Sequence, residues 1–246
     1  MARGPIVAID GPAGSGKSTT ARLVAEGLGF TYLDTGALYR AVTLHALNLG
    51  VDPEDEEGLG RVLREIELHF EPTGAGEGPR LIMNGRDVSE EIRSMRVAAS
   101  VSAVARSAVV RGSLVDLQRE IGRAGGFVVE GRDIGTVVFP DAEIKVFLVA
   151  DVEQRAERRL GDLRRAGDTE ISLEQVRKNL LDRDAIDSGR AIAPLRKAAD
   201  AVELDTSRLT IAEQVDKVVC FCTSLPTSTP DRSAGSPGEA APKSRS

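Results

Sequence analysis

"PIVAIDGPAGSGKSTTARLVAEGLG", residues 5–29, joins an apolar run to a helical pattern through three glycines within six residues. Glycine lets the backbone turn its N–H groups inward without a clash from Cβ. The letters GPAGSGKS match the pattern G-x-x-x-x-G-K-[S/T], with Gly11, Gly16, Lys17 and Ser18 at the fixed positions. A strand before this loop and a helix after it complete the pattern, so the stretch predicts a cradle for nucleotide phosphates.

Each residue type in this loop has its own expected role. Backbone N–H groups would hold the phosphates, Lys17 would reach the β and γ oxygens, and the Ser18 hydroxyl would bind Mg²⁺. The residues expected to contact ATP are consecutive: Gly11, Pro12, Ala13, Gly14, Ser15, Gly16, Lys17, Ser18 and Thr19. The pattern predicts that an NTP binds and leaves open what is done with it.

Short apolar runs alternate with longer amphipathic stretches along most of the chain. Buried strands are predicted at residues 5–10, 30–34, 126–131, 143–150 and 201–205. Strands that alternate with helices form a parallel sheet covered by helices on both faces. Only residues 60–95 break this rhythm, because two strand-like runs flank the glycine-rich stretch 74–78, which predicts an antiparallel insert.

The C-terminal part of the chain divides into a helical pattern and a polar tail. Residues 211–222 place Ile211, Val215, Val218 and Cys222 on one helical face, which predicts a closing helix. Its two adjacent thiols, Cys220 and Cys222, have no further His or Cys nearby and make a poor zinc site. Residues 223–246 are rich in Pro, Ser and Gly, so we expect a disordered tail.

Length and charge exclude several classes of protein. A chain of 246 residues is long enough for one sizeable core with an inserted subdomain. Its formal net charge of −6 argues against non-specific binding to nucleic acid, so any bound anion requires locally gathered arginines. No basic segment followed by an apolar one opens the sequence, and no apolar run approaches about 20 residues. We therefore expect a cytoplasmic protein without contact with a membrane.

Polar segments follow two of the predicted strands. LDTGALYR, residues 33–40, brings Thr35, Tyr39 and Arg40 into the first turns of a helix, and GRD, residues 131–133, ends the third strand. Ligands of open α/β sheets bind at the carboxyl ends of the strands, so both segments point to the crevice beside the phosphate loop. For GRD alone, a turn with a surface ion pair is the alternative.

The stretch RDAIDSGR, residues 183–190, lies toward the end of a helical pattern that Ser172 and Gln175 are predicted to start as a capping box. Arg183, Asp187 and Arg190 have the spacing of one helical face. Two arginines that flank a carboxylate suit a phosphorylated sugar, with guanidinium for the phosphate and carboxylate for the hydroxyls. A solvated helical face with an ion pair is the alternative.

Arginines also mark two other predicted helices. Arg155, Arg158 and Arg159 share a helical face before Gly167, which indicates either a solvated helix or a mobile lid that carries charge to a phosphoryl group. A second pattern predicts one helix over residues 97–121, and Arg111 falls on its apolar stripe. A charge on a core-facing stripe needs a partner or a ligand unless its side chain reaches back to solvent.

Five segments together resemble the family of bacterial cytidylate kinases (CMP kinases): IDGPAGSGKST, LDTGALYR, NGRDVSEEIR, GRDIGTVVFPDA and RDAIDSGRAIAPL. The resemblance covers about residues 5–220, and GRDIGTVVFP is much more specific to the family than the phosphate loop is. It implies an α/β P-loop kinase fold, in which helices flank a five-stranded parallel sheet. It also implies a mainly β monophosphate-binding insert at about 60–95 and a helical lid at about 155–170. The kinase domain would then be residues 1–222, followed by the tail 223–246.

The resemblance also implies a role for individual residues. The CMP phosphate would be held by Arg40, Arg132 and Arg190. The pentose would contact Arg183 and Asp187, and the base would contact Thr35, Ser102, Arg111 and Asp133, with Tyr39 and Gly131 in the same CMP site. Phosphoryl transfer would depend on Lys17, Arg132 and Arg190, and on Arg158 and Arg159 of the lid. For Asp133, a role in positioning Mg²⁺ is the alternative.

The implied reaction transfers a phosphoryl group from ATP to CMP or dCMP, with Mg²⁺, and belongs to pyrimidine nucleotide metabolism. The expected partners are these nucleotides alone, bound by a monomer. Two other functions stay open on the residues: a P-loop kinase for another monophosphate or an alcohol, and a regulatory NTPase that uses the loop as a switch. Arginines gathered at the crevice favour an acceptor that carries a phosphate.

Overall fold

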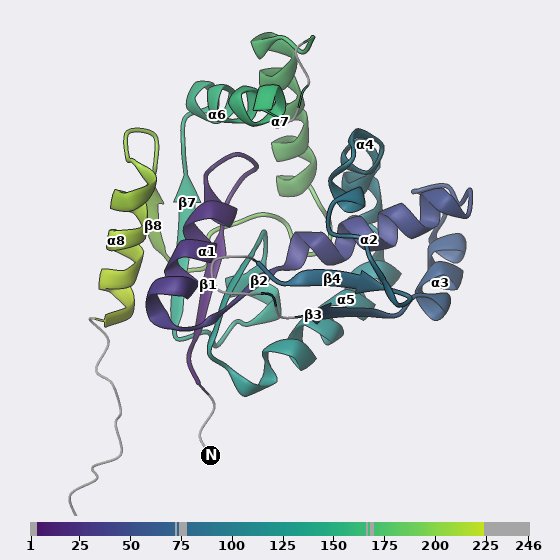
Figure 1. Ribbon diagram of the computed structural model, residues 1–246, viewed down its shortest axis with the longest axis horizontal. Coiled ribbons are helices and arrows are strands. Elements are labelled where there is room, and N and C mark those ends of the chain that lie inside the picture. The colour runs from purple at the N-terminus through teal and green to yellow at the C-terminus, as the bar shows by residue number, and fades with distance from the viewer. Residues whose placement is uncertain (1–3, 72, 74–77, 166, 168–169, 224–246) are drawn as a thin grey trace, which may run out of the picture.

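A five-stranded sheet forms the centre of the computed structural model, which describes residues 4–71, 73, 78–165, 167 and 170–223. The strand order is β2-β6-β1-β7-β8, and every neighbouring pair is parallel. The strands are β1 (Ile6–Asp10), β2 (Thr31–Asp34), β6 (Phe127–Gly131), β7 (Ile144–Val149) and β8 (Val202–Asp205). Each lies within a predicted apolar run, so the prediction of a parallel sheet is confirmed (Figure 1).

The two faces of the sheet are covered by different helices. Val7 and Ile9 of β1 pack toward α1 (Lys17–Leu28) and α8 (Ile211–Thr223). Ile6 and Ala8 pack on the opposite face, toward α5 (Ala108–Ile121) and the helical turn η3 (Ile134–Val138). All of β1 is buried, as expected for a central strand of a parallel sheet.

A second body of structure packs beside the sheet and encloses its own apolar core. Its antiparallel sheet has the order β3-β4-β5 and lies within the predicted insert, although residues 74–77 of the glycine-rich stretch lie outside the described residues. The other elements that contribute to this core are helical, and Leu38, Leu81 and Ile92 are among its fully buried side chains. The elements are α2 (Thr35–Asn48), α3 (Glu56–Glu65), β3 (Leu68–Glu71), β4 (Arg80–Met83), β5 (Arg86–Asp87), η1 (Glu91–Arg93) and α4 (Met95–Val104), and α5 adds Val110 and Leu114 to the core.

Helices α6 (Val152–Arg165) and α7 (Leu173–Ser188) pack against each other above the carboxyl ends of the strands (Figure 1). Their small core includes Ala156, Leu160 and Val176, and it reaches Ala13 of the phosphate loop. The predicted capping box at the start of α7 is confirmed, because Ser172 and Gln175 each bond the backbone N–H of the other.

The prediction of one helix over residues 97–121 is wrong. Helix α4 ends at Val104, and α5 begins at Ala108. Ser107 caps α5 by accepting a hydrogen bond from the backbone N–H of Val110 at 3.3 Å. The Glu56 carboxylate, from α3, accepts bonds from the Ser107 hydroxyl at 2.8 Å and from the Ala108 N–H at 2.9 Å. The break therefore depends on a carboxylate that is distant in the sequence.

The predicted closing helix is confirmed as α8, which contains both cysteines, Cys220 exposed and Cys222 half-buried. The predicted tail, apart from Thr223 at the end of α8, lies outside the described residues. Among the described residues we find no helix that is both long and apolar enough to cross a membrane.

Candidate active site

The phosphate loop connects β1 to α1 and depends on glycine for its shape. Gly11 has a φ of 148°, and a Cβ there would meet the carbonyl oxygen of Leu148 at 2.2 Å. Gly16 precedes α1 with a φ of 92°, and no side chain in the described part of the chain caps this helix. The first N–H groups of α1 are thus left without a side-chain acceptor, as a phosphate site at a helix N-terminus requires.

Lys17 is folded back onto the loop. Its Nζ donates to the carbonyl oxygen of Pro12 at 2.6 Å, and the residue is 5% exposed. Burial, and then the nearby Arg132 guanidinium, lower the pKa of Lys17 to about 7. Bound phosphate oxygens would favour the ammonium form again, because they place negative charge beside it.

A buried carboxylate that the sequence analysis did not single out lies beside Ser18. Glu130, near the end of β6, accepts hydrogen bonds from the Ser18 and Tyr32 hydroxyls. Burial, and then the Asp34 carboxylate, raise the pKa of Glu130. A hydroxyl and a carboxylate are hard oxygen donors of the kind that hold Mg²⁺ together with nucleotide phosphates, so these residues fit that ion. The available signal was an acidic residue at the end of an apolar run, directly before GRD.

A cluster of guanidinium groups around one carboxylate lies near the phosphate loop. Arg132 donates through Nε to Oδ2 of Asp187 at 2.8 Å, and Arg190 donates to the other oxygen, Oδ1. Burial alone would raise the pKa of Asp187, but the two arginines bring it below the usual value of 3.8. Asp187 therefore remains ionised and joins the segment after β6 to the end of α7.

This guanidinium cluster holds more positive charge than the Asp187 carboxylate balances. Arg183 lies in it beside Arg132 and Arg40, and burial followed by these two neighbours lowers the pKa of Arg183 to about 10. Nη1 of Arg40 lies 3.8 Å from Oδ2 of Asp34. Within the described part of the chain, the Nε atoms of Arg183 and Arg190 are buried without a hydrogen-bond partner. Buried donors that lack a partner are costly, so the cluster suits a bound anion such as a phosphate.

The spacing would place Arg183, Asp187 and Arg190 on one helical face if the helix continued to Arg190, and it does not. Helix α7 ends at Ser188, and Arg190 lies beyond Gly189, which caps the helix. The chain then turns, and Arg190 reaches Asp187 from outside the helix with its side chain only 6% exposed. The contact between Asp187 and Arg190 does form, but through the turn at the end of α7 and not along a helical face.

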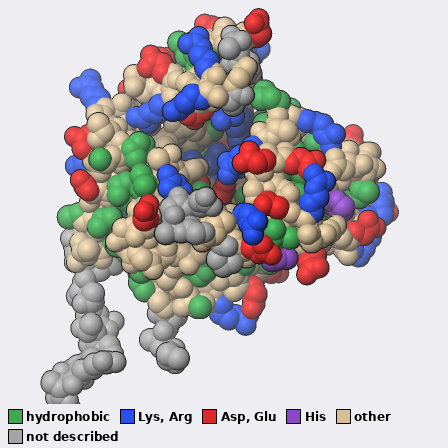
Figure 2. All heavy atoms as spheres, in the orientation of Figure 1, with side chains coloured by type: hydrophobic (Ala, Val, Ile, Leu, Met, Phe, Trp, Pro, Cys, Tyr) green, Lys and Arg blue, Asp and Glu red, His purple; other side chains and the backbone are tan. Residues whose placement is uncertain are grey.

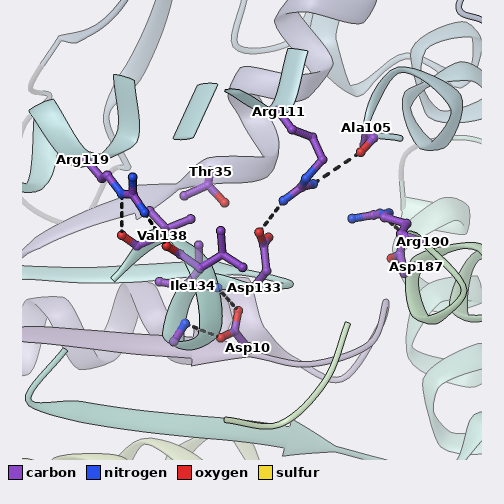
Figure 3. A network of polar contacts seen from close by, with 12 residues as sticks. Asp10, Thr35, Ala105, Arg111, Arg119, Asp133, Ile134, Val138, Asp187 and Arg190 are labelled. Carbon is purple, nitrogen blue, oxygen red and sulfur yellow. Dashed lines mark hydrogen bonds and ion pairs between the residues drawn. The ribbon is translucent and has the colours of Figure 1, made fainter. Parts of the chain in front are cut away.

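A second ion pair lies deeper in the site. Arg111 pairs with Asp133, and their side chains are 4% and 7% exposed. The Arg111 guanidinium also lies over the Tyr39 ring, 5.6 Å from its centre. It donates to the carbonyl oxygen of Ala105 at 3.4 Å (Figure 3). Burial raises the pKa of Asp133, and Arg111 acts against this shift. The alternative of an Arg111 that reaches back to solvent is therefore wrong.

Two other predicted base contacts lie on separate elements. The Thr35 hydroxyl, at the start of α2, donates to the carbonyl oxygen of Glu130 at 2.8 Å and so ties α2 to β6. Ser102 is half-buried on α4. Because α4 and α5 are separate helices, Ser102 and Arg111 are not fixed on one straight helix.

The arginines of α6 diverge into different surroundings. Arg155 is buried and donates to the carbonyl oxygen of Ala13 at 3.1 Å and to Asp184 of α7 at 2.6 Å, which rules out a purely solvated face. Arg158 donates to the carbonyl oxygen of Thr206 at 2.6 Å. Arg159 is among the charges that lower the pKa of Arg183. Figure 2 shows Lys and Arg side chains around the hollow beneath the α6–α7 pair.

Comparisons with known proteins agree with this geometry. Residues 7–224 match the family model described as cytidylate kinase. A cytidylate kinase from Bacillus pumilus is 46% identical over 213 residues, which are 87% of this chain and 93% of that protein. One from Limosilactobacillus reuteri is 45% identical over 218 residues, 89% and 95% of the two chains. A bifunctional pantoate ligase/cytidylate kinase from Synechocystis sp. is 50% identical over 215 residues, and the chain spans only 42% of its length.

Proposed function

The chain belongs to the cytidylate kinase family, and we propose from this membership and from the site that it transfers the γ-phosphoryl group of ATP to CMP or dCMP. The observation that carries the proposal is the closeness of two anion sites. The charges of Arg132 and Asp187 both act on the pKa of Lys17, so the arginine cluster adjoins the phosphate loop. Two phosphorylated molecules held this close are positioned for transfer between them.

The donor half would bind ATP through the loop from Gly11 to Thr19. Its N–H groups and Lys17 would hold the β and γ phosphates, with Arg158 and Arg159 of α6 above them. Ser18 and Glu130 would hold Mg²⁺, which when bound neutralises charge on the β and γ phosphates.

The acceptor half would bind the monophosphate in the arginine cluster. Arg40, Arg132 and Arg190 would hold its phosphate, while Asp187 would accept hydrogen bonds from the pentose hydroxyls beside Arg183. An oxygen of this phosphate attacks the γ-phosphorus in line, the bond to the β-phosphate oxygen breaks, and ADP and CDP result. The chain contributes position and charge, so the reaction requires no general base.

The base would be read by the pair of Arg111 and Asp133. An ionised carboxylate only accepts hydrogen bonds, so it fits the N4 amine of cytosine and repels the O4 of uracil. Arg111 would hold this carboxylate in place and donate to the base. Because Asp133 is already paired with Arg111, Glu130 is the better candidate for the Mg²⁺ role that the sequence left open for Asp133.

A coupled assay of ADP release with a panel of acceptors tests the proposal. The panel contains CMP, dCMP, UMP, AMP and small alcohols, and one reaction has no acceptor. We expect rapid ADP release with CMP and dCMP only. Release that prefers another monophosphate or an alcohol would indicate a different P-loop kinase. Release that does not depend on any acceptor would indicate a switch NTPase.

A further inference from the structure

The helical turn η3 follows Asp133 directly and is held at both ends by charged side chains (Figure 3). At its start, the two carboxylate oxygens of Asp10 accept hydrogen bonds from the N–H groups of Ile134 and Gly135, each at 2.8 Å. At its end, Arg119 donates through Nη2 to the carbonyl oxygen of Val137 at 2.8 Å and through Nε to that of Val138 at 3.1 Å.

These contacts match the polarity of the backbone. The N–H end of a helical turn carries partial positive charge and the C=O end partial negative charge, so a carboxylate and a guanidinium are each at the favourable end. Hydrogen bonds that involve an ionised group are stronger than neutral ones. The Arg119 fork also bonds two successive carbonyls at once, which a lysine ammonium cannot do in the same fixed geometry.

The helical turn η3 also fixes the backbone of Asp133. The carbonyl oxygen of Asp133 accepts from the N–H groups of Val137 at 2.9 Å and Val138 at 3.2 Å. The carbonyls that Arg119 bonds belong to these same two residues. A shift of Val137 and Val138 would therefore move the residue whose carboxylate faces Arg111.

Helix α5 contacts Asp133 and the turn that follows it at two points. Arg111, in its first half, bonds the Asp133 carboxylate, and Arg119, near its end, bonds the last carbonyls of the turn. Arg119 itself is an exposed residue, whereas Arg111 is buried. Arg119 thus contacts the segment that starts with Asp133 from its solvent side.

We propose that Arg119 is a positioning residue that, through η3, sets the orientation of Asp133 and so contributes to the choice between CMP and UMP. The proposal rests on the proposed function, in which Asp133 reads the base. Asp10 completes the same clamp from the end of β1, directly before the phosphate loop. Because Asp10 is buried, the exposed Arg119 is the side chain that is altered with less risk to the fold.

Steady-state kinetics of Arg119→Ala and Arg119→Lys, with CMP and with UMP at saturating ATP, test this role. Arg123→Ala is the matched control, because it removes an exposed arginine whose partner is Glu120. For Arg119→Ala we expect kcat/KM with CMP to fall roughly threefold to tenfold, mainly through KM, which is the effect of about one lost hydrogen bond. UMP should change less, so the CMP/UMP ratio falls. The KM for ATP should stay within about twofold. Arg119→Lys should recover part of the ratio, and Arg123→Ala should match the wild type.

A purely structural role would give a different result. The inference is overturned if Arg119→Ala lowers the melting temperature but leaves the ratio of kcat/KM for CMP to that for UMP unchanged. It is also overturned if the variant impairs the use of CMP, UMP and ATP equally. The wild-type assay separates this from failure of the proposed function. Wild-type protein that does not phosphorylate CMP overturns both, whereas wild-type CMP activity with an unchanged ratio in the variant overturns the inference alone.

Discussion

The phosphate loop and the arginine cluster are both anion sites, but they are built in opposite ways. The loop is a run of consecutive residues that offers backbone N–H groups and one lysine. The cluster consists of side chains from α2, the end of β6, α7 and the segment beyond α7. A backbone cradle is complete once its own residues fold, whereas the cluster exists only when distant elements have packed.

Their charge balance differs as well. In the loop a single cation, Lys17, is buried, forms no ion pair at hydrogen-bond distance with any residue that the structure describes, and has a lowered pKa. In the cluster Asp187 bonds two arginines, so the loss of one group leaves others unbalanced. The comparison teaches that the loop can hold the phosphates common to all NTPs, while the cluster and the Arg111–Asp133 pair carry selectivity for the acceptor.

The largest effect is expected from a variant that disables the ATP site, the donor half. Lys17→Ala removes the charge that would stabilise the transferring phosphoryl group, so we expect kcat to fall about 100-fold or more. The fold should persist, because among the described residues the Lys17 side chain makes one hydrogen bond, to its own loop. Turnover assays together with a thermal melt check both points. Near-normal turnover would disprove the phosphate-loop assignment.

A smaller effect is expected from the acceptor half. Asp187→Ala should raise the KM for CMP about tenfold or more, because it removes the proposed pentose contact and leaves Arg132 and Arg190 without their carboxylate. Binding of ATP, measured by calorimetry, should be unchanged. Asp182→Ala, which removes an exposed carboxylate from the same helix, is the control. An equal loss for ATP and CMP would mean that the two halves are not separate.

For Asp187→Ala we also expect a pH-dependent change in the free energy of unfolding. The pKa of Asp187 is lowered in the folded protein, so its ion pairs stabilise the fold above the ordinary value of 3.8 and are lost as the pH falls through the lowered value. The difference in unfolding free energy between wild type and Asp187→Ala should therefore be largest near neutral pH and shrink in acid. Urea unfolding at several pH values measures it, and a difference that grows in acid would contradict the assignment.

The smallest expected effect is a proton uptake, and it tests the difference in charge balance between the phosphate loop and the arginine cluster. With a pKa of about 7, Lys17 is mostly neutral at pH 8, and bound phosphates should return it to the ammonium form. Binding of ATP at pH 8 should then take up nearly one proton from the buffer, while binding of CMP should take up fewer. Calorimetry in two buffers of different ionisation enthalpy measures this uptake. Uptake that persists in Lys17→Met would assign it to another group.

The sequence predicted features whose determinants are neighbours along the chain, and it missed features that depend on distant residues. Spacing alone predicted the phosphate loop, because all its determinants are neighbours, and apolar runs predicted every strand of the parallel sheet. The break before α5 was missed because it depends on Glu56, a residue far away in the sequence. Asp10 and Glu130 were missed because a single acidic residue at a strand end has no distinguishing pattern until the neighbouring loops are in place.

The central claim is that the acceptor half, and Asp133 in it, selects cytosine. Asp133→Asn removes the charge and adds a donor, so the measurement is kcat/KM of this variant and of wild type with CMP and UMP, at low and high Mg²⁺. We predict that the CMP/UMP ratio falls about tenfold, since an unpaired buried polar group costs about 1–3 kcal/mol. An unchanged ratio would contradict the claim, and equal losses that Mg²⁺ partly restores would assign Asp133 to the metal.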